Sequence, residues 1–217
     1  MGSAGSADDA VWWRVAFEEA WQAHRHGSIA VGAVLVDEHG SVVLADRNRT
    51  GESGGPAGLL SGNRLAHAEV NVLARLGHTF PTGLRLLATL QPCVLCAGAC
   101  SFARVPQVVY AAVDAAWDGV EALHAASPLL RERAPTLAWA DLGLWSVWAE
   151  ALPLAGVLQR YGPDTRVGAC YATVNPALLE LAAALASDAG LTELDLHAAF
   201  ERWRDRLHAV SATRPTP

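Results

Sequence analysis

Four side chains in two short segments have the types and the spacing of a metal site that activates water. His67 and Glu69 lie in the segment His-Ala-Glu, and Cys93 and Cys96 lie in the later segment Pro-Cys-Val-Leu-Cys. Zinc binds imidazole nitrogen and thiolate sulfur, and a catalytic zinc site usually has three protein ligands. One His and two Cys meet that number, so we expect one Zn²⁺ per chain with water or hydroxide as its fourth ligand. The pKa of zinc-bound water falls to about 7, and the unligated Glu69 carboxylate would carry the protons.

Each of these residues taken alone also has a less specific interpretation. A Cys-x-x-Cys pair can be a redox dithiol or half of a structural zinc site, and a helical His is often only packed or exposed. A closed structural site needs a fourth ligand, for which Cys100 is the nearest candidate, one helical turn beyond Cys96. We expect Cys100 to pack as a small buried hydrophobe, and Cys170 to be a core or surface thiol. The two segments together favour the catalytic site.

The segments around these residues predict two helices and a strand. Residues 65–76 combine strong helix formers with apolar residues at three- and four-residue steps, which places His67 in the first turn of a helix. Residues 84–90 are a short apolar run before Gln91 and Pro92, as in a buried strand that proline ends. A second helix is expected to begin at Cys93. Helix N-termini carry partial positive charge, so both thiolates would be stabilised there.

The remaining elements complete an α/β pattern. A helix over 10–26 places Trp13, Phe17 and Trp21 on one face for core packing. Further strands are expected over 29–36, 42–45, 107–113 and 137–140, with a helix over 118–132. An antiparallel hairpin followed by parallel crossovers gives a three-layer α/β/α fold with a mixed five-stranded sheet. The metal ligands would then lie at helix N-termini beside the carboxyl edge of the sheet.

Two further regions are distinct in composition. Residues 50–63 are rich in Gly, Ser and Pro and connect Asn48 to the metal-binding helix, so we expect a loop that borders the substrate cavity, either as a lid or as a passive connection. Residues 144–217 show the signals of three helices. We therefore divide the chain into a zinc-dependent domain, 1–143, and a helical extension, 144–217, packed on the same domain. The extension could complete the core, cover the site or form a dimer surface, and we favour core packing.

Composition and charge restrict the partners. The chain has 217 residues, 52% of them hydrophobic, with a net charge of −6 and no dense basic run. Proteins that hold folded nucleic acid neutralise phosphates with clustered Lys and Arg, so a small-molecule substrate is favoured and nucleic acid is not. Arg47, Arg49 and Arg64 flank the site, and we favour ordinary solvated charges over phosphate contacts as their role. Four cysteines without a secretory or transmembrane segment predict a cytoplasmic protein with no membrane partner, and residues 1–6 predict a flexible lead-in.

Residues 10–142 resemble the cytidine deaminase-like superfamily, and the His-Ala-Glu and Pro-Cys-x-x-Cys segments carry this resemblance. The similarity is greatest to the branch of guanine deaminases, bacterial tRNA adenosine deaminases, cytosine deaminases and the riboflavin-pathway deaminase domain, because enzymes acting on free cytidine usually carry Cys in place of His67. Two departures stand out: Gln91 replaces a common Glu, and the basic C-terminal helix of the tRNA enzymes is missing. The resemblance implies a homodimer and these roles: zinc ligands His67, Cys93 and Cys96; proton shuttle Glu69; base contacts from the Asn48 side chain and the Ala68 backbone N–H.

The resulting prediction is a zinc-dependent hydrolase that deaminates a free nucleobase, nucleoside or related aminated heterocycle and releases ammonia. A purine-type ring is favoured, since the branch includes guanine deaminases. The alternative enzyme is a tRNA adenosine deaminase that converts adenosine to inosine. Alternatives of another class are a non-catalytic zinc-stabilised interaction domain and a redox dithiol protein.

Overall fold

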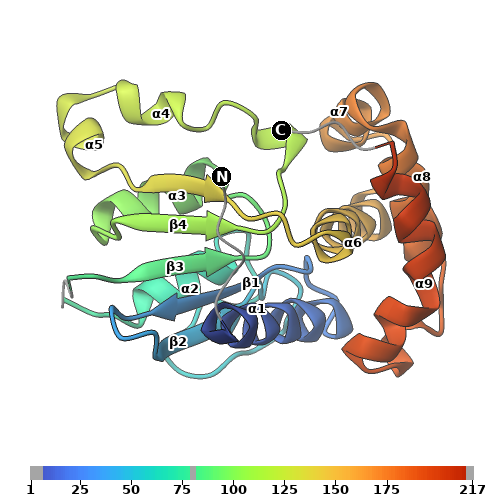
Figure 1. Ribbon diagram of the computed structural model, residues 1–217, viewed down its shortest axis with the longest axis horizontal. Helices are drawn as coiled ribbons and strands as arrows, with labels where there is room; N and C mark the ends of the chain where they lie inside the picture. Colours follow the sequence, from blue (N-terminus) through green and yellow to red (C-terminus); the bar gives the residue numbers. More distant parts are fainter. Residues whose placement is uncertain (1–6, 79–81, 214–217) are drawn as a thin grey trace.

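The computed structural model describes residues 7–78 and 82–213, so the lead-in predicted for residues 1–6 lies outside the described residues. A five-stranded sheet has the order β2-β1-β3-β4-β5 (Figure 1). Strand β1 pairs antiparallel with β2 and β3, whereas β3, β4 and β5 are parallel, which confirms the predicted mixed sheet. The strands are β1 Gly32–Val36, β2 Val42–Arg47, β3 Arg85–Ala88, β4 Gln107–Tyr110 and β5 Thr136–Trp139.

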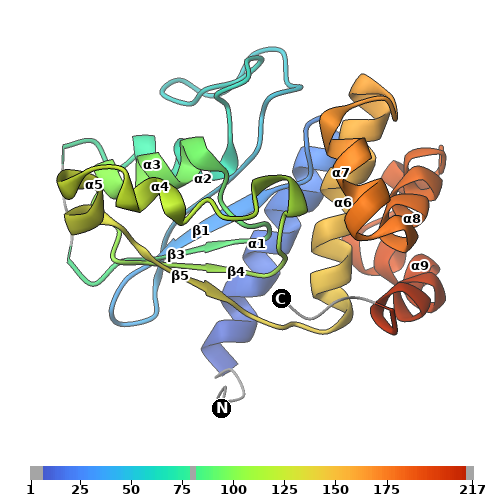
Figure 2. The same cartoon turned by 90° about the horizontal axis from the view of Figure 1, so that it is seen from above.

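Helices cover both faces of the sheet, which makes the predicted three layers. Helix α1 (Ala7–Arg25) lies on one face, and α2 (Ala68–Ala74) and α3 (Val94–Phe102) lie on the other (Figure 2). Successive residues of β1 alternate between the two cores: Val34 and Val36 belong to the cluster on the α1 side, and Ala33 and Leu35 to the cluster on the α2 side. This two-residue period explains why every residue of β1 is buried.

The predicted helix over 118–132 is confirmed only in part, because it is not continuous. The segment forms two short helices, α4 (Ala122–Ala125) and α5 (Pro128–Arg133), and a 3₁₀ turn, η1 (Ala115–Trp117), precedes it. Ser127 is extended, its hydroxyl accepts a hydrogen bond from the Leu130 N–H, and Pro128 is the first helical residue. Since proline lacks an N–H and favours an extended residue before it, it starts a new helix here and cannot continue the old one.

The extension has four α-helices where the sequence predicted three. They are α6 (Leu144–Tyr161), α7 (Arg166–Val174), α8 (Pro176–Ala186) and α9 (Leu196–Ser211), with the 3₁₀ turn η2 (Leu191–Glu193) before α9. The missed helix is α7, whose Gly, Thr, Val and Tyr residues have weak helix propensity. It begins because the Thr165 hydroxyl accepts a hydrogen bond from the Gly168 N–H. Over the described residues, no helix is long and apolar enough to cross a membrane.

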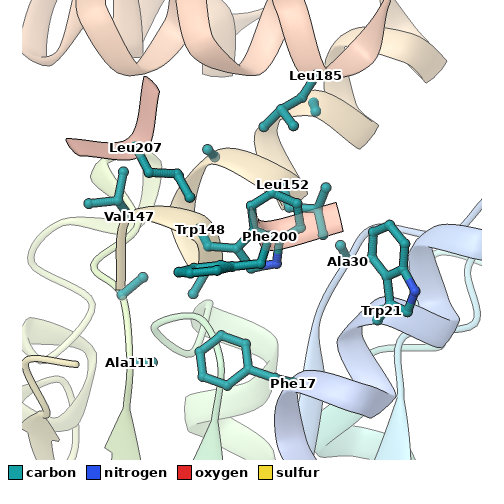
Figure 3. Close-up of a cluster of buried hydrophobic side chains, with 14 of the residues drawn as sticks. Phe17, Trp21, Ala30, Ala111, Val147, Trp148, Leu152, Leu185, Phe200 and Leu207 are labelled. Carbon is teal, nitrogen blue, oxygen red and sulfur yellow. The ribbon is translucent and has the colours of Figure 1, made fainter. Parts of the chain in front are cut away.

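Aromatic residues join the extension to the sheet and α1. Trp148 of α6 contacts both Phe200 of α9 and Trp21 of α1, with ring centroids 5.9 Å and 6.1 Å apart (Figure 3). Trp145 stacks on Phe200 at 3.9 Å between ring centroids. Trp148 is 1% exposed, and truncation of such a side chain costs about 3–5 kcal/mol. The predicted core face of α1 is confirmed, since Trp13, Phe17 and Trp21 are all buried. This packing holds α6 at the carboxyl ends of β3, β4 and β5 (Figure 1).

Candidate metal centre and cavity

The three predicted metal ligands lie within reach of one ion. The His67 Nδ1 atom is 3.6 Å from the Cys93 Sγ atom and 3.4 Å from the Cys96 Sγ atom, and the two sulfurs are 3.6 Å apart. With Zn–S bonds near 2.3 Å and Zn–N bonds near 2.0–2.1 Å, tetrahedral ligands are separated by about 3.6–3.8 Å. The donor atoms therefore fit zinc. Within the described residues, no other group of three His, Cys, Asp or Glu side chains could hold a metal ion.

Helix starts position these ligands. Helix α2 begins at Ala68 and not at residue 65, so His67 is its N-cap. His67 therefore lies just before the first turn, whereas the sequence predicted it within that turn. Cys93 is the N-cap of α3, and Cys96 lies in its first turn. Neither cap side chain makes a capping hydrogen bond, which leaves the imidazole and the thiol available for ligation. Both helix dipoles favour negative charge at this point, as predicted for the thiolates.

The thiols differ in acidity. The hydrogen bond with Cys96 and the nearby His67 lower the pKa of Cys93 to about 4, despite its burial. The contact with Cys93 and burial raise the pKa of Cys96 well above its ordinary value. Cys100 is fully buried in the cluster between the sheet and α2 and α3, and burial raises the pKa of its thiol, so its predicted packing role is confirmed. Cys170 is partly buried, with its thiol directed to the carbonyl oxygen of Ala115.

Glu69 lines the same cavity as His67 and Cys93. Its side chain is 3% exposed, and burial raises the pKa of its carboxyl group above the ordinary value. It is not one of the ligand group. A buried carboxyl beside a metal site and with a raised pKa is suited to accept and return protons near neutral pH.

The cavity has a volume of about 770 Å³ and two different walls. One wall comes from the segments around Asn48, His67 and Cys93, which the sequence analysis had identified as candidate site residues. The other comes from the extension, because α6 and α7 pack beside the ends of the strands (Figure 2). The extension residues that line it include Glu150, Pro153, Leu154, Arg160, Val167 and Tyr171. The extension therefore both completes the core and forms part of the cavity.

Asn48 lies at the end of β2 and lines the cavity. Its backbone N–H donates to the Val31 carbonyl, and its Oδ1 atom accepts from the N–H and the hydroxyl of Thr50. Since the oxygen is occupied, the amide nitrogen is the group left for a ligand. Ala68 is the first residue of α2, so its backbone N–H has no partner within the helix.

The loop over 50–63 borders the cavity, as predicted, through Thr50, Gly62 and Asn63. It is anchored to the helix that carries Glu69. Asn71 of α2 accepts from the Leu60 N–H at 2.8 Å and donates to the Leu60 carbonyl at 3.0 Å. The backbone of Arg49 binds the Gly62 N–H and the Ala66 carbonyl. These bonds favour a fixed cavity wall over a lid.

The interpretation of Arg47 and Arg49 as solvated charges is wrong. Arg49 donates to Asp46 at 2.9 Å and to Glu52 at 2.7 Å, and Arg47 donates to Glu52 at 2.8 Å. Both arginines are largely buried between these acids, because β2 and the following turn fold them onto α1. Arg64 is exposed and lines the cavity.

The sequence interpretation of the site missed Asp114 and Tyr171, and it gave no partner for Gln91. The Gln91 Oε1 atom accepts from the Asp114 N–H at 3.1 Å, and the Asp114 Oδ1 atom accepts from the Tyr171 hydroxyl at 3.4 Å. Burial raises the pKa of Asp114 to about 6. A signal for Asp114 existed, since it follows β4 at the carboxyl edge much as Asn48 follows β2. Tyr171 could not be found without α7.

Comparisons with known proteins agree with this geometry. The family model of the cytidine and deoxycytidylate deaminase zinc-binding region matches residues 6–112. The tRNA-specific adenosine deaminase of Aquifex aeolicus is 32% identical over 111 residues, 49% of this chain and 68% of that protein. The protein of the same name from Agrobacterium fabrum is 36% identical over 49% of this chain and 67% of its own length. A solved structure from a study of A-to-I editing by tRNA:A34 deaminases has 31% identity and a TM-score of 0.52, with 62% of this chain and 100% of that chain covered.

Proposed function

The chain belongs to the cytidine and deoxycytidylate deaminase family of zinc-binding hydrolases, and from this premise we propose that it deaminates a free nucleobase, nucleoside or related aminated heterocycle. One observation carries the proposal. The buried Glu69 carboxyl lines a cavity together with the ligand His67, whose imidazole lies at tetrahedral spacing from two thiols. That arrangement suits the replacement of an amine by an oxygen from water.

His67, Cys93 and Cys96 would hold the zinc. When bound, zinc supplies a Lewis acid that makes water a nucleophile near neutral pH. Glu69 takes a proton from the water whose oxygen bonds to the amine-bearing ring carbon, and returns it to the adjacent ring nitrogen. Glu69 then passes the second proton of that water to the leaving amine. The carbon–nitrogen bond breaks, ammonia leaves, and the ring carbon becomes a carbonyl.

Asn48 and Ala68 would orient the ring. Because the Asn48 oxygen is occupied by Thr50, its amide nitrogen donates to an acceptor of the ring. The N–H of Ala68, which has no partner within α2, would be a second donor from the buried start of this helix. Two donors from different elements place the amine-bearing carbon over the metal site.

The charge of the cavity supports a small uncharged substrate. Three carboxylates line it, from Glu69, Asp114 and Glu150, against the two arginines Arg64 and Arg160. Arg160 also donates to the Thr50 carbonyl, and helix α6 occupies that side of the cavity. A polynucleotide gains most of its affinity from neutralised phosphates, so this balance favours a base or nucleoside.

A tRNA adenosine deaminase is the second candidate. The observation in its favour is the 32–36% identity to relatives of that name. It predicts inosine formation in tRNA and RNA binding that weakens steeply with salt. We also propose a homodimer, which light scattering would detect as twice the chain mass of 22.9 kDa.

The test is an ammonia-release screen of the zinc-loaded protein with bases, nucleosides, pterins and aminated triazines, beside an inosine assay on tRNA. We expect ammonia from at least one small heterocycle and none from tRNA. Inosine in tRNA without turnover of any small molecule would establish the second candidate. If one zinc is bound per chain and neither assay responds, the proposed deamination is refuted.

A further inference from the structure

Gln91 presents a hydrogen-bond donor to the cavity. Its side chain is 5% exposed, and its Oε1 atom accepts from the Asp114 N–H at 3.1 Å. A backbone N–H can only donate, so the oxygen end of the amide is identified by its partner. The amide nitrogen is the other end, and no described residue accepts from it. Since Gln91 lines the cavity, this NH₂ group is available to a ligand.

Asp114 presents an acceptor beside that donor. Its Oδ1 atom accepts from the Ala116 N–H at 3.0 Å and from the Tyr171 hydroxyl at 3.4 Å. Its Oδ2 atom has no partner among the described residues, and Asp114 also lines the cavity. The Tyr171 hydroxyl in turn accepts from the Ala115 N–H at 3.3 Å. Helix α7 of the extension thus holds the carboxylate in a fixed orientation.

We propose that Gln91 and Asp114 are a specificity-determining pair that recognises a lactam, a ring carbonyl next to a ring N–H. The Gln91 amide donates to the carbonyl, and the Asp114 carboxylate accepts from the N–H. This inference rests on the proposed function and adds to it the substrate class: aminated oxo-heterocycles. A ring without the lactam leaves the Gln91 amide and the Asp114 carboxylate buried and unpaired. Unpaired buried polar groups discriminate against a ligand more strongly than a lost apolar contact does.

The neutral amide at residue 91 is essential to this pairing. A carboxylate there could still accept from the Asp114 N–H. It would, however, present an acceptor where the lactam carbonyl needs a donor, and it would place a second negative charge beside Asp114. Gln91→Glu therefore reverses the recognised pattern with almost no change in shape, whereas Gln91→Met removes it.

The test compares two purines that carry the amine on the same carbon. Guanine has the lactam, and 2-aminopurine lacks it. Binding to the zinc-loaded protein is measured by calorimetry, and ammonia release is measured separately. We expect the wild type to prefer guanine by about 10- to 100-fold in affinity, the range for a hydrogen bond to a charged group. Gln91→Met should lower this preference several-fold without abolishing it, because Asp114 still accepts from the ring N–H. Gln91→Glu should lower it further, because it places an acceptor against the ring carbonyl.

Gln22→Met is the matched control, since Gln22 lies in α1 and does not line the cavity. It should keep the wild-type preference, and zinc content and circular dichroism should confirm that all variants are folded. Equal binding of the two purines by the wild type, no binding of either, or an undiminished preference in Gln91→Met would overturn the pair. Guanine preference in binding without ammonia from any compound would leave the pair intact and refute the proposed deamination.

Discussion

Replacement of Arg49 by methionine should destabilise the protein through the charges that it leaves behind. The guanidinium of Arg49 is bonded to Asp46 at 2.9 Å and to Glu52 at 2.7 Å. Arg49 is 7% exposed and Asp46 is 2% exposed, so solvent screens this pair very little. Methionine keeps much of the side-chain length without the charge or the donors.

The expected size follows from the remaining partners. Removal of one member of a buried ion pair costs about 3–5 kcal/mol, because the other charge stays buried. Glu52 keeps its bond to Arg47, and Asp46 keeps the N–H of Arg47. These remaining bonds place the loss at the lower end, about 3 kcal/mol. That is a large part of the stability of an ordinary domain, about 5–15 kcal/mol.

Urea unfolding of the zinc-loaded protein, at a fixed zinc concentration, measures this loss. Arg49→Lys keeps the charge but reaches only one of the two acids, so we expect a smaller loss than for methionine. The double variant with Asp46→Asn should lose less than the sum of the two single variants, since the orphaned charge is gone. A loss under about 1 kcal/mol for Arg49→Met, or strict additivity, would refute this account of the buried pair.

Three further outcomes are expected. Glu69→Gln should keep one zinc per chain by metal analysis, yet its rate of ammonia release should fall at least about 100-fold, because an amide cannot transfer protons. Full turnover with zinc bound would rule out Glu69 as the proton carrier. Cys93→Ala should lose zinc and Cys170→Ala should keep it, and equal zinc contents would contradict the ligand set. Burial lowers the pKa of His24 to about 4 from its ordinary 6.5, so the unfolded chain binds the extra proton first as the pH falls. The free energy of unfolding, measured with urea, should therefore drop by up to about 3 kcal/mol as the pH falls from 6.5 to 4. The drop should be smaller in His24→Leu. If the pH profiles of the wild type and the variant were parallel, His24 would contribute nothing to the pH dependence.

Local patterns predicted the strands and the metal ligands. A buried strand such as β1 appears as an apolar run because helices cover both of its faces. His67, Cys93 and Cys96 stand at helix starts that their own flanking residues specify, so the sequence spacing already contained the geometry. Helix α7 and the break at Ser127 were not predicted, because short helices depend on caps and packing more than on propensity.

The chemical partners within the cavity were decided by the tertiary structure. Gln91 meets Asp114 across 23 residues of sequence, and Asp114 meets Tyr171 across 57. No periodicity reports such contacts, since they arise only when β4 and α7 are packed at the same edge of the sheet. The same holds for Arg47 and Arg49, whose charges appear solvated in a linear reading and are buried against acids in the fold. The sequence by itself therefore predicted the proposed reaction, through metal-binding residue types at local helix starts and the family resemblance that they carry. Tertiary packing decided the surroundings of the substrate, because the extension and the strand ends meet only in the folded chain.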